Sequence, residues 1–128
     1  MSDGTRLLEQ ARALLPRAHA PYSGFRVAAA LEDEHGTVHP GVNVESASFG
    51  ITICAERNAL FGALARGATR FRRIAIACEP ASTCVPCGAC RQILTELAPD
   101  LEVIVESPEG VPEMIPLRDL LPRPFLLP

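Results

Sequence analysis

The chain has 128 residues, a length typical of one domain with its own hydrophobic core, and we expect a single domain over residues 1–128. It has no lysine, its arginines are scattered, and its formal net charge is -3. A nucleic-acid-binding surface needs clustered positive charge, so this class of partner is not expected. The N-terminal segment resembles neither a secretory signal nor a membrane span, which predicts a cytoplasmic protein without membrane contacts.

The first third of the chain is predicted to form a helix followed by a β-hairpin. Apolar residues recur at helical spacing over residues 5–19, with Thr5 as the expected N-terminal cap. Residues 25–31 and 37–44 are strand-like and flank a charged turn that includes Glu34 and Gly36. These two strands are therefore expected to pair with each other.

The remainder alternates between helix and strand. Helices are expected over residues 54–66 and 88–98, and short apolar strands over 73–78 and 101–106. Six of the twelve prolines fall in residues 108–128, which predicts an irregular tail with a short strand near Met114 and one helical turn near Leu117.

This order of elements predicts an α/β fold: a three-layer α/β/α sandwich around a mixed sheet of about five strands. The strand–helix–strand–helix–strand portion should form right-handed parallel crossovers. Adjacent units of that kind place the N-termini of their helices side by side, so Cys54 should lie close to the Cys87-x-x-Cys90 pair.

Three cysteines and a carboxylate at these two helix starts predict a catalytic zinc site. Structural zinc sites use four protein ligands, whereas catalytic sites use three and keep one position open. Cys54, Cys87 and Cys90 are the expected ligands, and Glu56 is placed to move protons to and from a water. Three thiolates leave Zn²⁺ with an excess negative charge, so a nearby cation is expected, and Arg57 is favoured over Arg91.

Other residues of the same types have simpler interpretations. Cys78 ends an apolar strand and is expected to be a buried small hydrophobic residue. Cys84 is three residues before Cys87 and remains an alternative ligand, although Cys54 is preferred because Glu56 accompanies it. The histidines have no metal-like spacing, and two of them, His35 and His39, lie in or beside the charged turn, where a solvated position is expected.

Three separated motifs resemble those of the homotetrameric, three-cysteine cytidine deaminases, and the resemblance spans nearly the whole chain. They begin at Pro21 (PYSGFRVAAAL), Gly41 (GVNVESASFG) and Cys54 (CAERNAL), and are followed by PCGAC from Pro86. The signature of the zinc nucleobase deaminases has the same ligand spacing.

The resemblance implies hydrolytic deamination of cytidine and deoxycytidine in pyrimidine salvage, by attack of a zinc-activated water at C4 of the base. It implies that Glu56 shuttles protons, that Arg57 hydrogen-bonds the ligand thiolates, and that the protein is a homotetramer whose sites are completed by neighbouring subunits. It also implies the following substrate contacts: Phe25, Asn43, Glu45, Ala55 and, from a neighbouring subunit, Phe125.

Two features depart from the family pattern, and three rival functions remain. Phe49 stands where the family often has tyrosine, and Cys84 stands where it seldom has a thiol. The rivals are a blasticidin-S-type deaminase, a nucleic-acid-editing deaminase, and a zinc-stabilised module without catalysis. The last of these would need a fourth protein ligand, for which Cys84 is the candidate.

Overall fold

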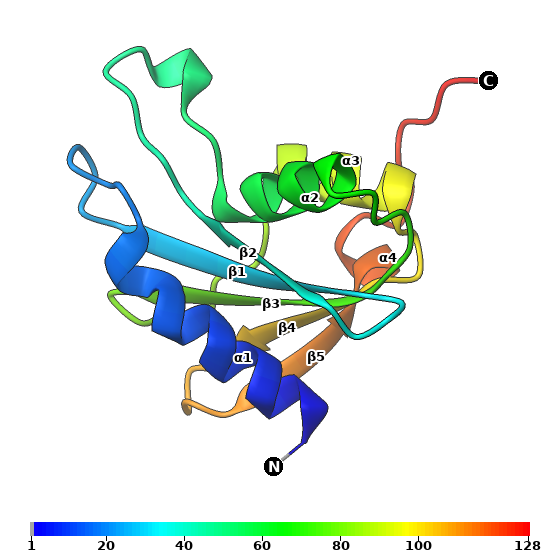
Figure 1. The fold of residues 1–128 in the computed structure, drawn as a ribbon, viewed down its shortest axis with the longest axis horizontal. Helices are drawn as coiled ribbons and strands as arrows, with labels where there is room; N and C mark the ends of the chain where they lie inside the picture. The colour runs from blue at the N-terminus through cyan, green and yellow to red at the C-terminus, as the bar shows by residue number, and fades with distance from the viewer. Residues whose placement is uncertain (1) are drawn as a thin grey trace.

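The computed structural model describes residues 2–128, which form one five-stranded sheet with helices on both faces (Figure 1). The sheet order is β2-β1-β3-β4-β5. The strands are bounded as follows: β1 Arg26–Asp33, β2 Val38–Val42, β3 Phe71–Glu79, β4 Glu102–Glu106 and β5 Pro112–Pro116. The helices are bounded as follows: α1 Asp3–Leu14, α2 Ala55–Ala65, α3 Gly88–Leu97 and α4 Leu117–Leu120, with short 3-10 turns η1 Leu15–Arg17 and η2 Phe49–Ile51. The predicted mixed sheet and three-layer architecture are confirmed.

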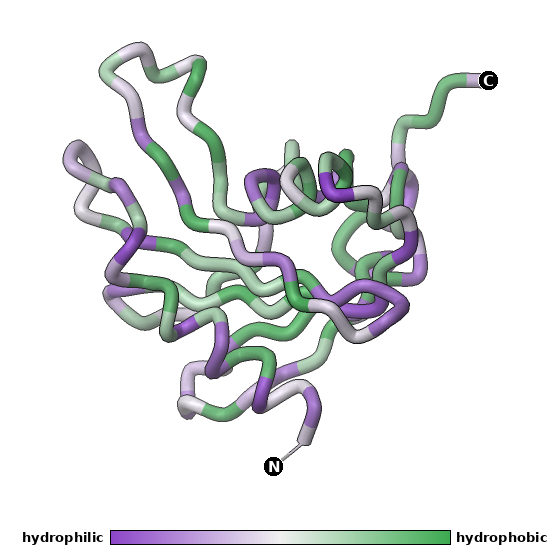
Figure 2. Tube along the Cα trace, in the orientation of Figure 1, coloured by the Kyte–Doolittle hydropathy of each residue, from purple (hydrophilic) through white to green (hydrophobic). Residues whose placement is uncertain are grey.

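The alternation of side chains along the strands creates two hydrophobic cores. On one face, α1 packs over small side chains, and the members of that cluster from the sheet are Ala28, Ala30, Ala75, Ala77 and Ile104. On the other face, α2, α3 and α4 cover larger ones, and the members from the sheet are Ala29, Leu31, Ile74, Ile76, Val103 and Val105. Figure 2 shows this apolar centre beneath a more polar exterior. Successive residues of one strand thus supply different cores, because side chains alternate between faces.

The strand pairings confirm part of the predicted topology. β1 and β2 form the expected antiparallel hairpin, and β3 and β4 are parallel neighbours joined through α3. β1, however, lies between β2 and β3 and is antiparallel to both. The β2–α2–β3 connection therefore passes over β1: β2 and β3 run parallel, as predicted for a crossover, but they are not neighbours in the sheet.

The first helix begins earlier than predicted. Ser2, not Thr5, is the N-terminal cap of α1, and its hydroxyl accepts a hydrogen bond from the Thr5 backbone N–H. The α-helix ends at Leu14, and the chain continues as η1, with Pro16 inside it. Serine and threonine are both good N-caps, so residue type alone does not decide between Ser2 and Thr5.

A close approach between β2 and α2 fixes the start of α2. Gly41 lies on β2, and a Cβ atom there would sit 2.2 Å from the Ala55 carbonyl oxygen and 2.5 Å from the Ala59 backbone nitrogen. Ala55, Ala59 and Ala63 are fully buried along this side of the helix. The absence of side-chain bulk on both elements lets the helix start, with Cys54 and Glu56, lie directly against the sheet.

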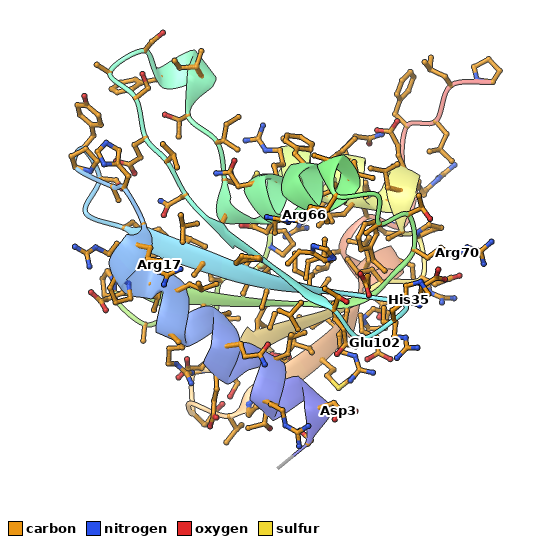
Figure 3. The ribbon with its side chains drawn as sticks, viewed as in Figure 1. Asp3, Arg17, His35, Arg66, Arg70 and Glu102 are labelled. Carbon is orange, nitrogen blue, oxygen red and sulfur yellow. The ribbon has the colours of Figure 1, made fainter. Side chains whose placement is uncertain are left out.

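Two segments extend away from the body. One is the arm between β2 and α2, and the other is the C-terminal tail that follows α4 (Figure 1). Both carry exposed apolar side chains, with Phe49 76% and Leu127 81% exposed. In Figure 3, His35, Arg70 and Glu102 lie at the end of the sheet away from the arm. None of the helices found in residues 2–128 has the length and apolar character to cross a membrane.

Candidate active site

The three predicted ligands meet at the N-termini of two helices. Cys54 is the N-cap of α2, Cys87 is the N-cap of α3, and Cys90 lies in the first turn of α3. Their sulfur atoms lie within 4.8 Å of one another, with 3.7 Å between Cys54 and Cys87 and 3.6 Å between Cys87 and Cys90. Neither N-cap is engaged in a side-chain capping bond, and the helix ends provide free N–H groups and partial positive charge that favour thiolates.

This geometry fits zinc. Two Zn–S bonds of about 2.3 Å at a tetrahedral angle place their sulfurs about 3.8 Å apart. The Cys54–Cys87 and Cys87–Cys90 sulfur separations agree with that value. Among the described residues, the metal-capable group consists of these three thiols, so Cys84 is not a fourth ligand of the cluster. A three-thiolate site leaves one coordination position open for water or substrate.

One of the three thiols, that of Cys54, is biased toward the thiolate form. The pKa of Cys54 is lowered to about 5, because the Cys90 thiol hydrogen-bonds to its sulfur and Arg57 stabilises the anion. The same contact raises the pKa of Cys90, which keeps its proton as the donor of the pair. Arg57 Nη2 lies 3.4 Å from Cys54 Sγ, and this contact raises the pKa of the guanidinium. The preference for Arg57 as the nearby cation agrees with these distances.

Glu56 is a buried carboxyl beside the thiols. It lies in the first turn of α2 and is only 4% exposed. Burial raises its pKa to about 7, and the negative charge of Cys54 adds to the shift. A carboxyl with a pKa near neutrality can both accept and donate a proton at physiological pH.

A cavity of about 300 Å³ joins this cluster to residues of the hairpin and the arm. The predicted residues that line it are Phe25, Asn43, Glu45, Cys54, Ala55, Glu56 and Cys87. Small-molecule sites are usually concave, mostly apolar and equipped with a few convergent polar groups. The cavity has these features and is open to a ligand of nucleoside size.

Comparison with known proteins agrees with the geometry of this site. The family model described as "Cytidine and deoxycytidylate deaminase zinc-binding region" matches residues 1–106. The chain belongs to this family. A cytidine deaminase from Halalkalibacterium halodurans is 40% identical over 124 residues, covering 96% of this chain and 94% of the relative.

Solved structures of the family have the same fold. A cytidine deaminase from Burkholderia pseudomallei has a TM-score of 0.89 and 45% identity, covering 98% of this chain and 100% of that one. A cytidine deaminase from Mycobacterium tuberculosis has a TM-score of 0.87 and 34% identity, covering 99% and 100%. The family resemblance and the zinc cofactor inferred from the motifs are thereby confirmed.

Asn43 and Glu45 are both tied to nearby backbone. Asn43 Oδ1 accepts from the Val27 N–H at 2.9 Å, and its Nδ2 donates to the Phe25 carbonyl at 2.9 Å. Glu45 accepts the backbone N–H groups of Tyr22 and Ser23 and the Ser23 hydroxyl, and these bonds lower its pKa. Glu45 is therefore a preformed anion at the mouth of the cavity.

Phe125 is the one predicted substrate contact that does not line this cavity. It lies in the tail, is 70% exposed, and its carbonyl accepts a 2.6 Å hydrogen bond from Gln92 of α3. Within one chain, the tail and the arm extend from opposite sides of the α2–α3 layer (Figure 1). A contact between Phe125 and this type of cavity would therefore have to be made with another copy.

Several lining residues were not predicted as site residues. Cys84 and Val85 precede the Pro86-Cys87 turn, and Thr52 and Ile53 precede Cys54. Their positions next to the ligands in the sequence could have predicted that they line the cavity, because residues beside a metal ligand in a loop generally share its cavity. Burial raises the pKa of Cys84 to about 12, so it contributes a neutral thiol to the wall. Cys78 is buried, as expected.

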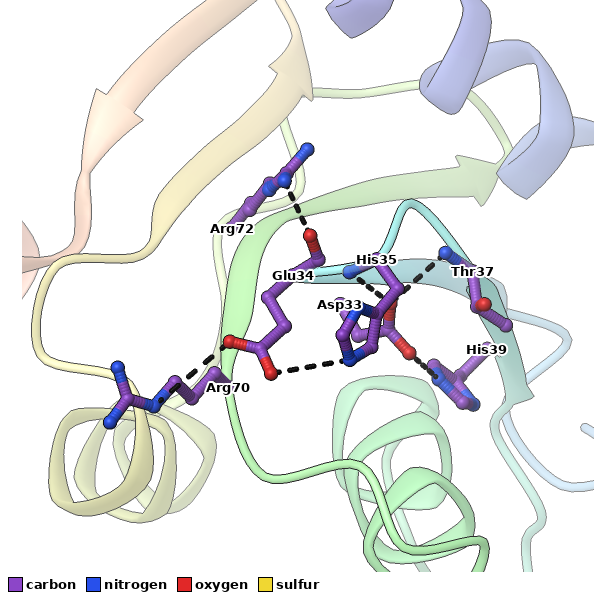
Figure 4. A network of polar contacts seen from close by, with 7 residues as sticks. All are labelled: Asp33, Glu34, His35, Thr37, His39, Arg70 and Arg72. Atoms are coloured by element: carbon purple, nitrogen blue, oxygen red, sulfur yellow. Dashed lines mark hydrogen bonds and ion pairs between the residues drawn. The ribbon is translucent and has the colours of Figure 1, made fainter.

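The expectation for His39 was wrong. His39 is 4% exposed, and its Nε2 lies 2.9 Å from Asp33 Oδ2, while Arg66 Nη1 lies 3.2 Å from its Nδ1. Figure 4 shows the contact between Asp33 and His39 at the β1–β2 turn, where Asp33 also accepts the backbone N–H groups of His35 and Thr37. One of the two buried positions of β2 is thus filled by a paired polar residue. His19 and His35 are exposed, as expected for His35.

Proposed function

We propose that this protein catalyses the hydrolytic deamination of cytidine and deoxycytidine to uridine and deoxyuridine, with release of ammonia. The observation that carries the proposal is the shared cavity, in which two of the three converging thiols, those of Cys54 and Cys87, and a buried carboxyl face the same space as Asn43 and Glu45. Relatives that cover nearly the whole chain are cytidine deaminases, which supports the choice of a cytosine nucleoside.

Cys54, Cys87 and Cys90 would hold the zinc, which, when bound, lowers the pKa of a water at its open position. Glu56 would take a proton from the attacking water and deliver it to N3 of the base. It would then pass a proton to the leaving amino group, which departs as ammonia. The raised pKa of about 7 supports this exchange, because neither protonation state is strongly disfavoured near neutral pH.

The hairpin and the arm would bind the nucleoside. Glu45 is a fixed carboxylate that can accept a sugar hydroxyl. Asn43 keeps one amide hydrogen beyond its bond to the Phe25 carbonyl, so it can donate to the same sugar. Phe25 is 37% exposed and lines the cavity, which suits contact with the sugar or the base, and Ala55 would border the base.

Arg57 would offset the negative charge of the three thiolates. Its guanidinium touches Cys54, the ligand nearest in sequence to Glu56. Without this cation, three thiolates would leave the bound metal with a net charge of minus one and a weaker effect on water. Partners of this kind typically change metal affinity or activity by about 10–100-fold.

We also propose a homotetramer in which Phe125 of one subunit reaches the cavity of another. Exposed apolar residues of the loop before β1, the arm and the tail support it: Tyr22, Phe49, Ile51, Phe125, Leu126 and Leu127. Exposed apolar side chains that gather in patches mark protein–protein contacts. Tyr22 and Phe49 are in edge-to-face contact beside a second hollow of about 360 Å³, which shares Ser23 and Glu45 with the substrate cavity. A role in pyrimidine salvage and a cytoplasmic location, where five free thiols remain reduced, complete the proposal.

The test is the loss of ultraviolet absorbance of cytidine on addition of the purified, zinc-loaded protein. We expect turnover by the wild type and none above background by Glu56→Ala, with equal zinc content in both. Substantial turnover by a folded, zinc-loaded Glu56→Ala variant would contradict the role of Glu56. Absence of turnover by the wild type would contradict the substrate and direct the assay to other cytosine compounds, blasticidin S first.

A further inference from the structure

Arg91 follows the ligand Cys90 directly and is hydrogen-bonded to the loop that carries the ligand Cys87. Its backbone N–H donates to the Cys87 carbonyl at 2.9 Å. Its Nε donates to the Pro86 carbonyl at 2.7 Å. The backbone bond is an ordinary helical one, so the side chain of Arg91 adds the bond to the Pro86 carbonyl, directly before Cys87, and Arg91 is not part of the cavity lining.

The same guanidinium also holds the start of the C-terminal tail. Arg91 Nη1 donates to the carbonyl of Leu120, the last residue of α4, at 2.9 Å. The next residue, Gln92, donates from Nε2 to the Phe125 carbonyl at 2.6 Å. Two adjacent residues of α3 thus fasten the tail at both ends of the segment that leads to Phe125.

The chemistry of arginine makes this a rigid link. The guanidinium is planar, permanently charged and has five donors in a fixed arrangement, so it can bridge two carbonyls without adjusting its geometry. The carbonyls at the end of a helix have no partner within the helix, and Leu120 is in this position. Hydrogen bonds from a charged donor are stronger than neutral ones. A displacement of the Cys87 loop would therefore be transmitted to α4 and the tail.

We propose that Arg91 is a positioning residue that couples metal occupancy to the C-terminal tail. Zinc held by Cys87 and Cys90 fixes the first turn of α3 against the Pro86–Cys87 loop, and Arg91 extends that order to Leu120. Because binding couplings are reciprocal, attachment of the tail also slows the loss of zinc. The proposal concerns zinc and the tail alone, so its tests do not depend on which nucleoside is the substrate.

The first experiment measures zinc release to an excess of a chromogenic chelator. We expect Arg91→Ala to release zinc about 10–100-fold faster than the wild type. The zinc-release rate of Arg91→Lys should lie between those of the wild type and Arg91→Ala, because one ammonium group can bind only one of the Pro86 and Leu120 carbonyls well. Gln92→Ala frees the tail at Phe125 but keeps the Arg91 bonds to Pro86 and Leu120, so it should release zinc more slowly than Arg91→Ala.

Two controls separate positioning from general instability. Arg118→Ala removes an exposed arginine of α4 that pairs only with Asp100, so it should release zinc at the wild-type rate. Ile104→Val loses a methylene from the core on the α1 face, away from the ligands. It lowers the stability of the fold without changing the bonds of Arg91 to Pro86 and Leu120. The proposal is overturned if Arg91→Ala releases zinc no faster than Ile104→Val.

The second experiment follows the tail itself, by the rate of chymotrypsin cleavage after Phe125 measured by mass spectrometry. Cleavage should be faster in the zinc-free wild type than in the zinc-loaded wild type, and zinc should no longer slow it in Arg91→Ala. Equal cleavage of the wild type with and without zinc would overturn the coupling. This comparison needs no variant, so it tests the coupling of zinc to the tail even if Arg91→Ala does not fold, in which case Arg91→Lys tests the part of Arg91.

Discussion

Two buried carboxyl groups of similar exposure have opposite acidities in this molecule. Asp33, at the β1–β2 turn, is 5% exposed and Glu56, at the start of α2, is 4% exposed. The hydrogen bond from His39 lowers the pKa of Asp33, with further bonds from the backbone of His35 and Thr37. Glu56 lacks such a set of donors, and burial raises its pKa to about 7.

The comparison shows that burial alone does not decide the charge of a carboxyl group. Donors that favour the anion can outweigh desolvation, as at Asp33, whereas desolvation prevails where they are few, as at Glu56. The carboxylate of Asp33 is hydrogen-bonded to His35, Thr37 and His39 and fixes a turn. The carboxyl of Glu56 faces a cavity and is suited to proton transfer.

The largest expected effect comes from removing the titratable group of the proposed site. Glu56→Gln keeps the size and shape of the side chain but cannot exchange the proton, so we expect kcat to fall by about 10²–10⁴-fold. Steady-state cytidine turnover at equal zinc content measures this. Asp33→Asn is the matched control, and it should retain the wild-type kcat per folded molecule. A similar loss in both variants would remove the distinction between the two sites.

The pH dependence of stability should have opposite signs at the two carboxyls. The folded-state pKa of Glu56 is raised, so its contribution favours folding at low pH and is lost as pH rises from about 4.5 to about 7. In zinc-free protein, Glu56→Gln should therefore gain stability relative to the wild type between pH 4.5 and pH 8, by on the order of 3 kcal/mol. Urea unfolding at both pH values measures this difference.

For Asp33 the folded-state pKa is lowered, so its contribution is present above the unfolded pKa and is lost as pH falls through the folded value. Asp33→Asn should therefore lose stability relative to the wild type at neutral pH, and the difference should shrink in acid. Parallel pH profiles for Asp33→Asn and Glu56→Gln would contradict the pKa assignments of both groups.

A third prediction concerns the strand that runs between the two sites. A methyl group at Gly41 would overlap the backbone of α2, which cannot move aside as a flexible side chain could. We expect Gly41→Ala to destabilise the protein by about 3 kcal/mol, at the upper end of the range for overpacking, and to reduce activity by displacing Glu56. Thermal or urea unfolding with a parallel activity assay measures both. Gly50→Ala, where added bulk meets nothing within 4 Å, is the control.

The smallest expected effect tests the network at the turn. His39→Ala removes a buried imidazole that contacts both Asp33 and Arg66, so we expect a loss of about 2 kcal/mol of stability. Turnover per folded molecule should be unchanged, because the network lies outside the cavity. His35→Ala, at an exposed position of the same turn, should leave stability close to that of the wild type. A selective loss of turnover in His39→Ala would show that the two sites communicate.

Much of this molecule was predictable from local sequence. Apolar periodicity located every helix and strand to within a few residues, because a helix and a strand impose different spacings on the residues they bury. The spacing of Cys54, Glu56, Cys87 and Cys90 identified the metal cluster, since zinc chemistry demands particular ligands at helix starts. Charge balance called for a nearby cation, and Arg57 was preferred because it is closest in sequence to both Cys54 and Glu56.

Other features depended on contacts between distant segments. No local pattern places β1 between β2 and β3, because strand order depends on which edges pair after the chain collapses. The burial of His39 required Asp33 and Arg66 to converge on it from the turn and from the end of α2. Arg91 is adjacent to a ligand in sequence and Arg57 is three residues from one, yet Arg91 holds the Pro86 and Leu120 carbonyls and Arg57 holds a thiolate.

The sequence by itself therefore determined the kinds of element, the metal ligands and the class of chemistry, since these follow from residue type and spacing along one segment. The tertiary structure alone decided the pKa of each buried carboxyl and the partner of each arginine. Those properties depend on donors, acceptors and excluded solvent that come from segments far apart in the chain, and they exist only once the segments have packed.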